Sequence, residues 1–370
     1  MLTFPRPWYC PFFIILATVL RATSTTQAQA RRPIDKVVDS LAARFLADTT
    51  RHGLAVGILR PGRDETYYYG RAHRAGSRPI DAGSLFEVGS VTKLYTAFVL
   101  ANLEYEGRLR RDDYLADHLP AALGPGQRWA RQITLRQLAT HTSGLPAYES
   151  TRALAALPGF DENDPYRVCD SAFVFRSLAA VDSLPEQGRV KYSNLGMALL
   201  AYSLQHRSRA RYEQLLTRYV RRPLKLREVH LQVPAAAQPR VAIPHRGSEV
   251  MPLIQLHAFA PAGGIKTTMP GLLDFLRVHL RPRSARTRWV AAHTLQNQLT
   301  PPADPVGLGW GMYTIEGETV FFHTGGTYGS SSIVLLVPSR NVGVALLANT
   351  ATDQLTGSAI TLAKQLIRQH

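Results

Sequence analysis

Cysteine is almost absent from this sequence, which has two in 370 residues, Cys10 and Cys169. Cys10 lies in an N-terminal segment that we expect to be removed, so the mature chain keeps one cysteine and cannot form an intrachain disulfide. Free cysteine is among the most buried residue types. We therefore predict that packing alone stabilises the fold and that Cys169 is a small core residue, with a reactive thiol as the alternative.

Lysine and the acidic residues are also scarce. Six Lys stand against 37 Arg, Asp and Glu together number 27, and the net charge is +16. The arginines are scattered, and their small groups lack the interleaved aromatic residues of a nucleic-acid surface. We predict no nucleic-acid partner and at most an attraction to anionic polymers of the cell envelope. A hydrophobic content of 45% excludes a disordered chain.

Long hydrophobic runs are missing as well. The apolar run at residues 10–20 includes Pro11 and is shorter than the ~20 residues needed to cross a bilayer. Arg6 precedes this run and the triplet AQA at 28–30 follows it, which is the pattern of a secretory signal. We predict cleavage after Ala30, export to the periplasm or the extracellular space, and no stable membrane insertion of the mature chain. A retained anchor is the alternative.

Several common catalytic and cofactor motifs do not occur. The sequence has no GxSxG elbow, no HExxH, no glycine-rich phosphate loop and no dinucleotide fingerprint. No cofactor is therefore implied. His141 has no partners at metal-ligand spacing, so we predict no metal site and interpret this histidine as structural.

Hydrophobic periodicity predicts strands near both ends of the chain and helices between them. The expected helices cover residues 34–48, 91–106, 134–141, 166–180, 195–205, 211–219, 269–280 and 353–368. The expected strands cover 54–59, 65–69, 309–315, 319–323, 331–337 and 342–347, the first two joined by a Pro-Gly turn. This order predicts an α+β fold, in which one antiparallel sheet is built from both termini and a helical region is inserted at about 91–300.

Residues 87–93, EVGSVTK, carry the sharpest chemical pattern. A strand-like run meets a glycine and then a long apolar helix, which places Ser90 at the start of that helix. Ser90 and Lys93 are three residues apart, so they share one helical face and an amine can reach the hydroxyl. A buried lysine with a lowered pKa can take the proton of a serine nucleophile. A serine that only caps the helix is the alternative.

Two further segments combine polar side chains with turns. Residues 191–194, KYSN, offer Tyr192 as a proton relay and Asn194 as a donor to a substrate carbonyl. Their alternatives are a packed aromatic ring and a helix cap. Residues 322–327, FHTGGT, end an edge-capable strand, where the N–H of Gly326 can pair with that of Ser90 as an oxyanion hole. A β-bulge or tight turn is the alternative there.

In order and spacing, these three segments resemble the signature elements of the serine β-lactamase-like hydrolases. The likeness is nearest to class C β-lactamases, D-alanyl-D-alanine carboxypeptidases and related esterases. Further matching stretches are QLATHTSGLP at 137–146, PAGGIKTT at 261–268 and GLGWG at 307–311. The resemblance covers nearly the whole mature chain, so we expect a single β-lactamase-related hydrolase domain over 31–370.

The resemblance implies a role for each matching residue. Ser90 would be acylated, and Lys93 and Tyr192 would share the general-base and general-acid work. Asn194 would contact the substrate. The opposite wall of the groove would be lined by His323, Thr324 and Gly325.

One departure from the family pattern concerns the third segment. Penicillin-recognising members usually have lysine at the position of His323, and a lysine offers a permanent cation for a substrate carboxylate. Histidine is only partly charged near neutral pH. This departure places β-lactamase activity in doubt and favours an esterase or a D-amino-acid peptidase or amidase.

Two rival functions stay open at this point. A binding or sensor module could recognise cell-wall peptide in the same groove while acylating slowly or not at all. A structural envelope protein could attach through its basic surface. The rival nucleophiles Ser143 and Ser330, Ser331 and Ser332 lack a base at helical spacing. A small molecule or a cell-wall peptide is the expected substrate, and the oligomeric state is left open.

Overall fold

The computed structural model describes residues 32–73, 77–120, 126–147, 154–162, 165–166, 168–300 and 304–369. The expected signal at 1–30 lies outside these residues, so export stays a prediction. Among the described residues, no helix is both long and apolar enough to span a bilayer.

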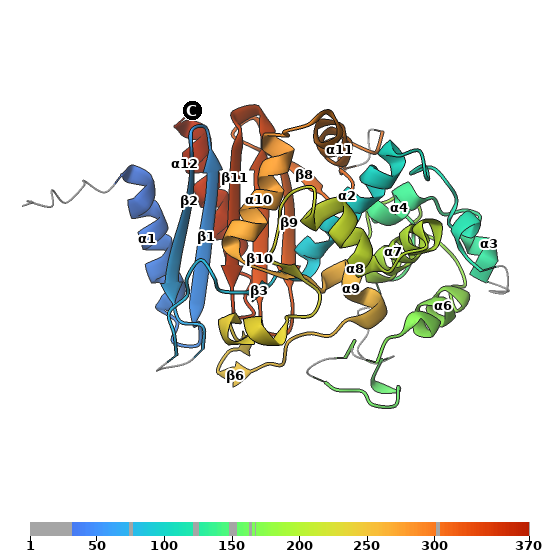
Figure 1. The fold of residues 1–370 in the computed structure, drawn as a ribbon, viewed down its shortest axis with the longest axis horizontal. Helices are drawn as coiled ribbons and strands as arrows, with labels where there is room; N and C mark the ends of the chain where they lie inside the picture. The colour runs from blue at the N-terminus through green and yellow to red at the C-terminus, as the bar shows by residue number, and fades with distance from the viewer. Residues whose placement is uncertain are drawn as a thin grey trace, which may run out of the picture.

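A six-stranded antiparallel sheet forms the body of the protein, with the strand order β2-β1-β11-β10-β9-β8 (Figure 1). Its strands are β1 (Gly53–Arg60), β2 (Arg63–Gly70), β8 (Gly311–Ile315), β9 (Glu318–Gly326), β10 (Ser331–Val337) and β11 (Val342–Ala348). The N-terminal hairpin pairs with β11, with Leu54 opposite Ala348. The expected sheet from both termini is therefore confirmed.

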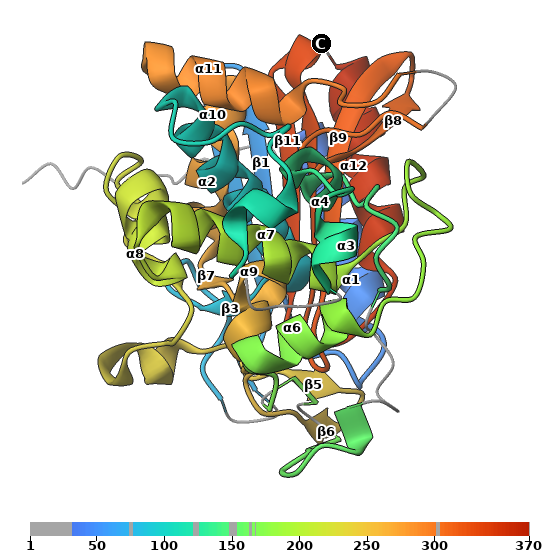
Figure 2. The ribbon, with the colours of Figure 1, turned by 90° about the vertical axis from the view of Figure 1, so that its right-hand side faces the viewer.

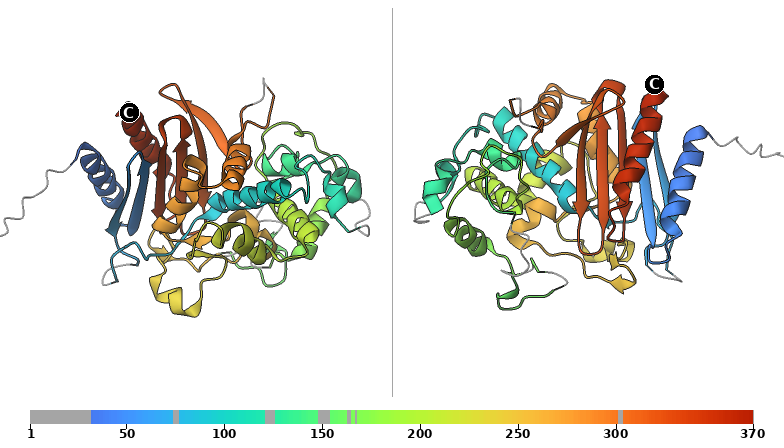
Figure 3. Two further views of the ribbon diagram at one scale, coloured as in Figure 1. Left: turned by 45° about the horizontal axis from the view of Figure 1, so that its top comes forward. Right: turned by 180° about the vertical axis from the view of Figure 1, so that it is seen from behind.

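Helices α1 (Pro33–Leu46) and α12 (Leu355–Arg368) cover the outer face of this sheet (Figure 3, right). Ile34, Val38, Leu41 and Phe45 recur every three or four residues along α1, so one stripe of the helix is buried. They join the aliphatic side chains of α12 and of the strands in one apolar cluster. Apolar contacts dominate this face, and beside them the buried Glu65 of β2 is paired with Arg32 and Arg60.

Helix α10 (Met269–Leu280) packs on the inner face, with both ends where the sequence predicts them. Its close approach depends on Gly57 of β1. A Cβ at this glycine would lie 2.5 Å from the sulfur of Met269 and 2.8 Å from Leu273. The missing side chain lets α10 lie directly on the strand.

The helical region continues beyond α10 around the buried helix α2 (Thr92–Tyr105) (Figure 2). Its other helices with described bounds are α3 (Gly126–Ala130), α4 (Leu135–Ala139), α6 (Ser171–Ala179), α7 (Asn194–Ser208), α8 (Tyr212–Leu216), α9 (Ala260–Gly263) and α11 (Ala285–Leu295). A small sheet of β3 (Phe86–Glu87), β7 (Lys266–Thr267) and β4 (Val229–His230) connects this region to the body, and β5 (His245–Arg246) pairs with β6 (Glu249–Val250).

Several details of the helical region differ from the sequence prediction, which also lacks the short helices α3 and α9 and ends α7 at 205 in place of Ser208. Helix α6 begins at Ser171, not at 166, because the side chain of Asp170 accepts a hydrogen bond from the Phe173 N–H at 2.7 Å and caps it there. Helix α8 ends at Leu216, and the chain continues as a π-helical turn over Thr217–Arg221. Helix α11 was not predicted, because its arginine-rich sequence shows little apolar periodicity. Cys169 precedes α6 and is buried, as predicted.

Candidate active site

Ser90 lies in a single helical turn, Gly89–Val91, between β3 and α2. This turn touches the end of β9. A Cβ at Gly89, whose φ is +48°, would lie 2.7 Å from the nitrogen of Gly326, and a Cβ at Gly325 would lie 2.1 Å from the Val88 carbonyl oxygen and 3.1 Å from the nitrogen of Ser90. Glycine is therefore required where the strand meets the serine turn.

Lys93 and Tyr192 converge on the Ser90 hydroxyl. The Lys93 ammonium donates to Ser90 Oγ at 3.0 Å and to the Ala262 carbonyl oxygen at 2.6 Å. The Tyr192 hydroxyl is hydrogen-bonded to the same Ser90 Oγ. Lys93 is fully buried, and its nitrogen lies 4.6 Å from the centre of the Tyr192 ring. The three side chains that the sequence singles out therefore form one cluster.

This cluster has the geometry of an activated nucleophile. A serine hydroxyl needs a base within hydrogen-bond reach, and here it has both an amine and a phenol. A buried cation beside a phenol stabilises its ionised form, which is the better base. The arrangement can therefore take the serine proton as a new bond to Oγ forms.

The two expected oxyanion-hole donors also lie near each other. The close fit between Gly89 and the nitrogen of Gly326 brings the end of β9 against the main chain of Ser90. A Cβ at Gly326 would meet nothing within 4 Å, so the space beside this residue is open. Strand β8 pairs with β9 only as far as Phe322, so no described strand pairs with the last residues of β9 on that side. A substrate carbonyl has access from there.

Asn194 begins α7 and lines a cavity of about 60 Å³ together with Ser90, Tyr166, Phe259 and Gly326. The helix cap is Ser193, whose hydroxyl accepts from the Gly196 N–H at 3.0 Å. The alternative in which Asn194 caps the helix is therefore wrong. Its side chain is left available to the cavity.

A second cavity, of about 180 Å³, is lined by Tyr192 and His141. His323 and Thr324 of β9 line it, and apolar side chains supply most of its remaining wall, including Val190, Trp310 and Phe322. Neither Lys nor Arg is among the described residues that line the two cavities. The ammonium of Lys93, which donates to Ser90 Oγ, is therefore the nearest cation to the nucleophile, and the described walls of the two cavities add none.

His323 is neutral in this setting. Burial and the charge of Lys93 lower its pKa to about 3, although a hydrogen bond to the Thr324 carbonyl oxygen opposes them. Because a carbonyl oxygen only accepts, Nδ1 of His323 carries the hydrogen and donates a hydrogen bond to the Thr324 carbonyl oxygen. A partly charged histidine is expected from the sequence alone, and the structure removes that charge near neutral pH.

His141 contributes to the same wall. Its ring packs on that of Tyr192 at 4.6 Å, and its Nδ1 accepts from the Ser193 N–H at 3.1 Å. Burial lowers the pKa of His141 well below its usual value, and the charge of Lys93 lowers it further. A neutral imidazole that positions Tyr192 agrees with the structural reading of this residue.

Sequence reasoning missed one partner of the cluster, the carbonyl oxygen of Ala262 that accepts from Lys93. It belongs to the stretch 261–268, which matches the family pattern without suggesting a role. Two of the rival serines have structural partners instead. Ser332 Oγ donates to the Val88 carbonyl at 2.7 Å, and Ser331 Oγ donates to that of Thr352 at 2.9 Å.

Known proteins are similar to this chain over most of its length. The sequence pattern of the family described as Beta-lactamase matches residues 38–366. Penicillin-binding protein 4 of Amycolatopsis lactamdurans is 28% identical over 83% of this chain and 84% of its own. The D-alanyl-D-alanine-carboxypeptidase/endopeptidase AmpH of Escherichia coli is 26% identical over 89% of each chain.

A solved structure shows the same fold. The class C β-lactamase of Rhodobacter sphaeroides superposes with a TM-score of 0.76 at 22% identity, over 90% of this chain and 99% of that one. The likeness extends to the sheet and the helical region alike.

Proposed function

This chain belongs to the Beta-lactamase family of serine hydrolases, and from that premise we propose that it cleaves an ester, amide or lactam bond through an acyl-Ser90 intermediate. The observation that carries the proposal is the convergence of Lys93 and Tyr192 on Ser90 Oγ. We also propose that residues 31–370 act as one exported hydrolase domain, because the leader has the pattern of a secretory signal.

Each step of this reaction has a group at hand. Ser90 Oγ attacks the carbonyl carbon while its proton passes to the Tyr192–Lys93 pair. The main-chain N–H groups of Ser90 and Gly326 hold the oxyanion. Collapse of the tetrahedral intermediate breaks the bond to the leaving group, which takes the proton back from the pair. A water molecule, deprotonated by the same pair, then attacks the acyl carbonyl carbon. The pair returns this proton to Ser90 Oγ as the acyl–Oγ bond breaks.

The two cavities suggest how a substrate lies. Tyr192 lines the 180 Å³ cavity, so the leaving group that receives its proton would occupy this apolar space. The acyl group would occupy the 60 Å³ cavity beside Asn194 and Phe259. Because His323 is neutral, an ester or amide with an uncharged leaving group is favoured over a substrate that carries a carboxylate there.

Intact mass spectrometry of the wild type and Ser90→Ala tests this function. We expect a fluorophosphonate to add to the wild type only, and penicillin, which carries a carboxylate, to add slowly or not at all. Failure of both reagents to label the folded wild type would reject the hydrolase in favour of a binding module that recognises cell-wall peptide without acylation.

His323→Lys tests the substrate class. With esters that differ only in a carboxylate on the leaving group, the wild type should prefer the neutral ester. The variant should gain about tenfold in kcat/KM for the charged ester, because a charge-assisted hydrogen bond contributes ~1.5 kcal/mol or more. Equal rates of the two esters in both proteins would contradict the assignment of the leaving-group cavity.

A further inference from the structure

Glu87, three residues before Ser90, is a buried carboxylate that the reaction as described does not use. It is 2% exposed. One oxygen accepts from the Ile254 N–H at 2.6 Å, and the other accepts from the Thr327 hydroxyl at 2.7 Å. Burying a carboxylate is costly unless it is paired and hydrogen-bonded. These partners come from two segments far from Glu87 in the sequence.

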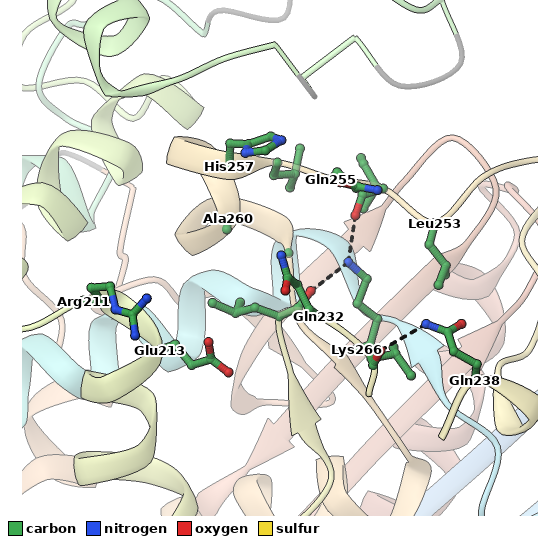
Figure 4. Close-up of a pocket in the computed structure, with 14 residues that line it drawn as sticks. Arg211, Glu213, Gln232, Gln238, Leu253, Gln255, His257, Ala260 and Lys266 are labelled. Carbon is green, nitrogen blue, oxygen red and sulfur yellow. Dashed lines mark hydrogen bonds between the residues drawn. The ribbon is translucent and has the colours of Figure 1, made fainter. Parts of the chain in front are cut away.

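Lys266 supplies the opposite charge. It lies across from Glu87 in the pairing of β3 with β7 and is 5% exposed. Its ammonium donates to the Ile254 carbonyl oxygen at 2.8 Å and to that of Leu231 at 3.3 Å (Figure 4). Glu87 and Lys266 therefore hold the N–H and the C=O of the same residue, Ile254.

Ile254 is part of the wall of the acyl cavity. It lines the 60 Å³ cavity beside Ser90, and it also lines a larger cavity of about 490 Å³. Figure 4 shows Lys266 within the larger cavity, where Leu253 and Gln255 flank Ile254 in the chain. A shift of this segment would change the shape of the space next to the nucleophile.

Thr327 connects Glu87 to the oxyanion hole. It directly follows Gly326, and its hydroxyl accepts from the N–H of Gly329 at 3.3 Å and of Ser330 at 3.0 Å while donating to Glu87. The turn between β9 and β10 is thus fastened to the strand that leads into Ser90. Burial raises the pKa of Glu87, whereas the charge of Lys266 and the bonds from Thr327 and Ile254 favour the ionised form.

We propose that Glu87 is a positioning residue, which holds the Gly326 N–H through Thr327 and the acyl-cavity wall through Ile254 in the arrangement that acylation of Ser90 requires. This inference rests on the proposed function. Oxyanion-hole donors act only when they are fixed where charge develops, so a loosened turn lowers the rate of acylation more than it weakens initial binding. Lys266 balances the charge that Glu87 brings into the interior.

The test uses Thr327→Val, which removes the hydroxyl at similar volume, and Thr327→Ser, which restores it. Glu87→Gln, which keeps one acceptor and removes the charge, is the second probe. Glu318→Gln is the matched control, because Glu318 lies at the other end of β9 and also binds a hydroxyl and a cation, Ser339 and Arg340. The readouts are the rate and binding constants of fluorophosphonate labelling, the affinity for an arylboronic acid, and the melting temperature.

We expect Thr327→Val and Glu87→Gln to lower the labelling rate constant by about 10- to 100-fold, below the loss of ~10²–10³ seen when an oxyanion donor is removed outright. The binding constant should stay within about twofold, because the cavity wall at Ile254 and the Gly326 N–H stabilise mainly the transition state that forms as Oγ attacks. Boronate affinity should fall in parallel with the rate, since the boronate adduct is tetrahedral. Thr327→Ser and Glu318→Gln should behave like the wild type.

Each outcome supports or overturns the positioning role of Glu87. If the wild type and Thr327→Val are labelled equally fast, the positioning role of Glu87 is overturned. The proposed function is unaffected by that result. Thr327→Ser as slow as Thr327→Val also overturns the positioning role, since the hydroxyl would then be irrelevant. If the wild type itself is not labelled, the proposed function fails and this inference fails with it. A misfolded Glu87→Gln leaves the Thr327 pair to decide.

Discussion

The outer and inner faces of the six-stranded sheet are built from different kinds of residue. On the outer face, α1 and α12 meet the strands through aliphatic and aromatic side chains such as Val38, Phe45, Leu335 and Leu362. On the inner side, Lys93, Glu87 and Lys266 are buried together with neutral histidines. The outer face is stabilised mainly by burial of apolar side chains, with Glu65 as a buried carboxylate paired with Arg32 and Arg60. On the inner side the buried charged groups surround Ser90 and its partners.

Tyr192→Phe tests the inner side most strongly. It should lower the rate of acylation by about 10²- to 10⁴-fold, the usual range for a lost general acid–base group, with little change in melting temperature. Tyr95→Phe is the matched control, because Tyr95 is buried on α2 and its hydroxyl has no hydrogen-bond partner in the described part of the chain. Equal activity in the two variants would remove Tyr192 from the proposed mechanism.

Gly325→Ala should have the next largest effect. Its Cβ would lie 2.1 Å from the Val88 carbonyl oxygen, so β9 must move away from the serine turn. We expect a loss of about 10²-fold in acylation, comparable to a lost oxyanion donor. Gly357→Ala on α12, where a Cβ meets nothing within 4 Å, should keep full activity and gain ~0.5–1 kcal/mol of stability. Titration with urea and a labelling assay measure both.

Leu362→Ala probes the outer face alone. Leu362 is fully buried in the cluster of α1, α12 and the strands. Its truncation should cost about 2–5 kcal/mol of unfolding free energy through lost burial and a cavity. The labelling rate of the remaining folded protein should be unchanged. A rate that falls with the stability would show that the two faces are coupled.

The pH dependence of stability should come largely from the inner side. His279 of α10 is buried among aromatic rings, and burial lowers its pKa to about 4. The pKa of this histidine in the unfolded chain is ~6.5. Below that pH the unfolded chain binds a proton that the folded protein does not bind, so stability is lost as the pH falls towards 4. Between pH 7 and pH 5 this residue alone should cost about 2 kcal/mol.

His279→Gln should shrink the stability difference between pH 7 and pH 5 by about that amount. Chemical unfolding of both proteins at the two pH values measures it. An unchanged difference would show that His279 is protonated in the folded state.

The sequence predicted some elements to the residue and missed others. Helix α10 begins at Met269 and ends at Leu280 as expected, because Thr268 caps it and its apolar residues recur at helical spacing. Helix α11 was missed, because four of its residues are buried by its neighbours without a clear periodic stripe. The start of α6 was placed five residues early, since the cap at Asp170 outweighed the apolar residues before it.

Part of the candidate site could likewise be predicted from the sequence, and part could not. The spacing of Ser90 and Lys93 follows from helical geometry, so the sequence alone could place them together. The hydrogen bonds that Lys93 donates to Ala262 and Thr327 donates to Glu87 join residues 169 and 240 positions apart. Such pairs leave no local pattern, and only packing shows them.

By itself, the sequence determined the order of strands and helices and the three polar segments, because periodicity and turns are local properties of the chain. The tertiary structure decided the charge of His323, which burial and Lys93 set together. It also decided that Ser193 and not Asn194 caps α7, and that Glu87 fastens the turn after Gly326. These features depend on distances between segments that are remote in sequence, and the free energy of burial exists only once those segments have packed.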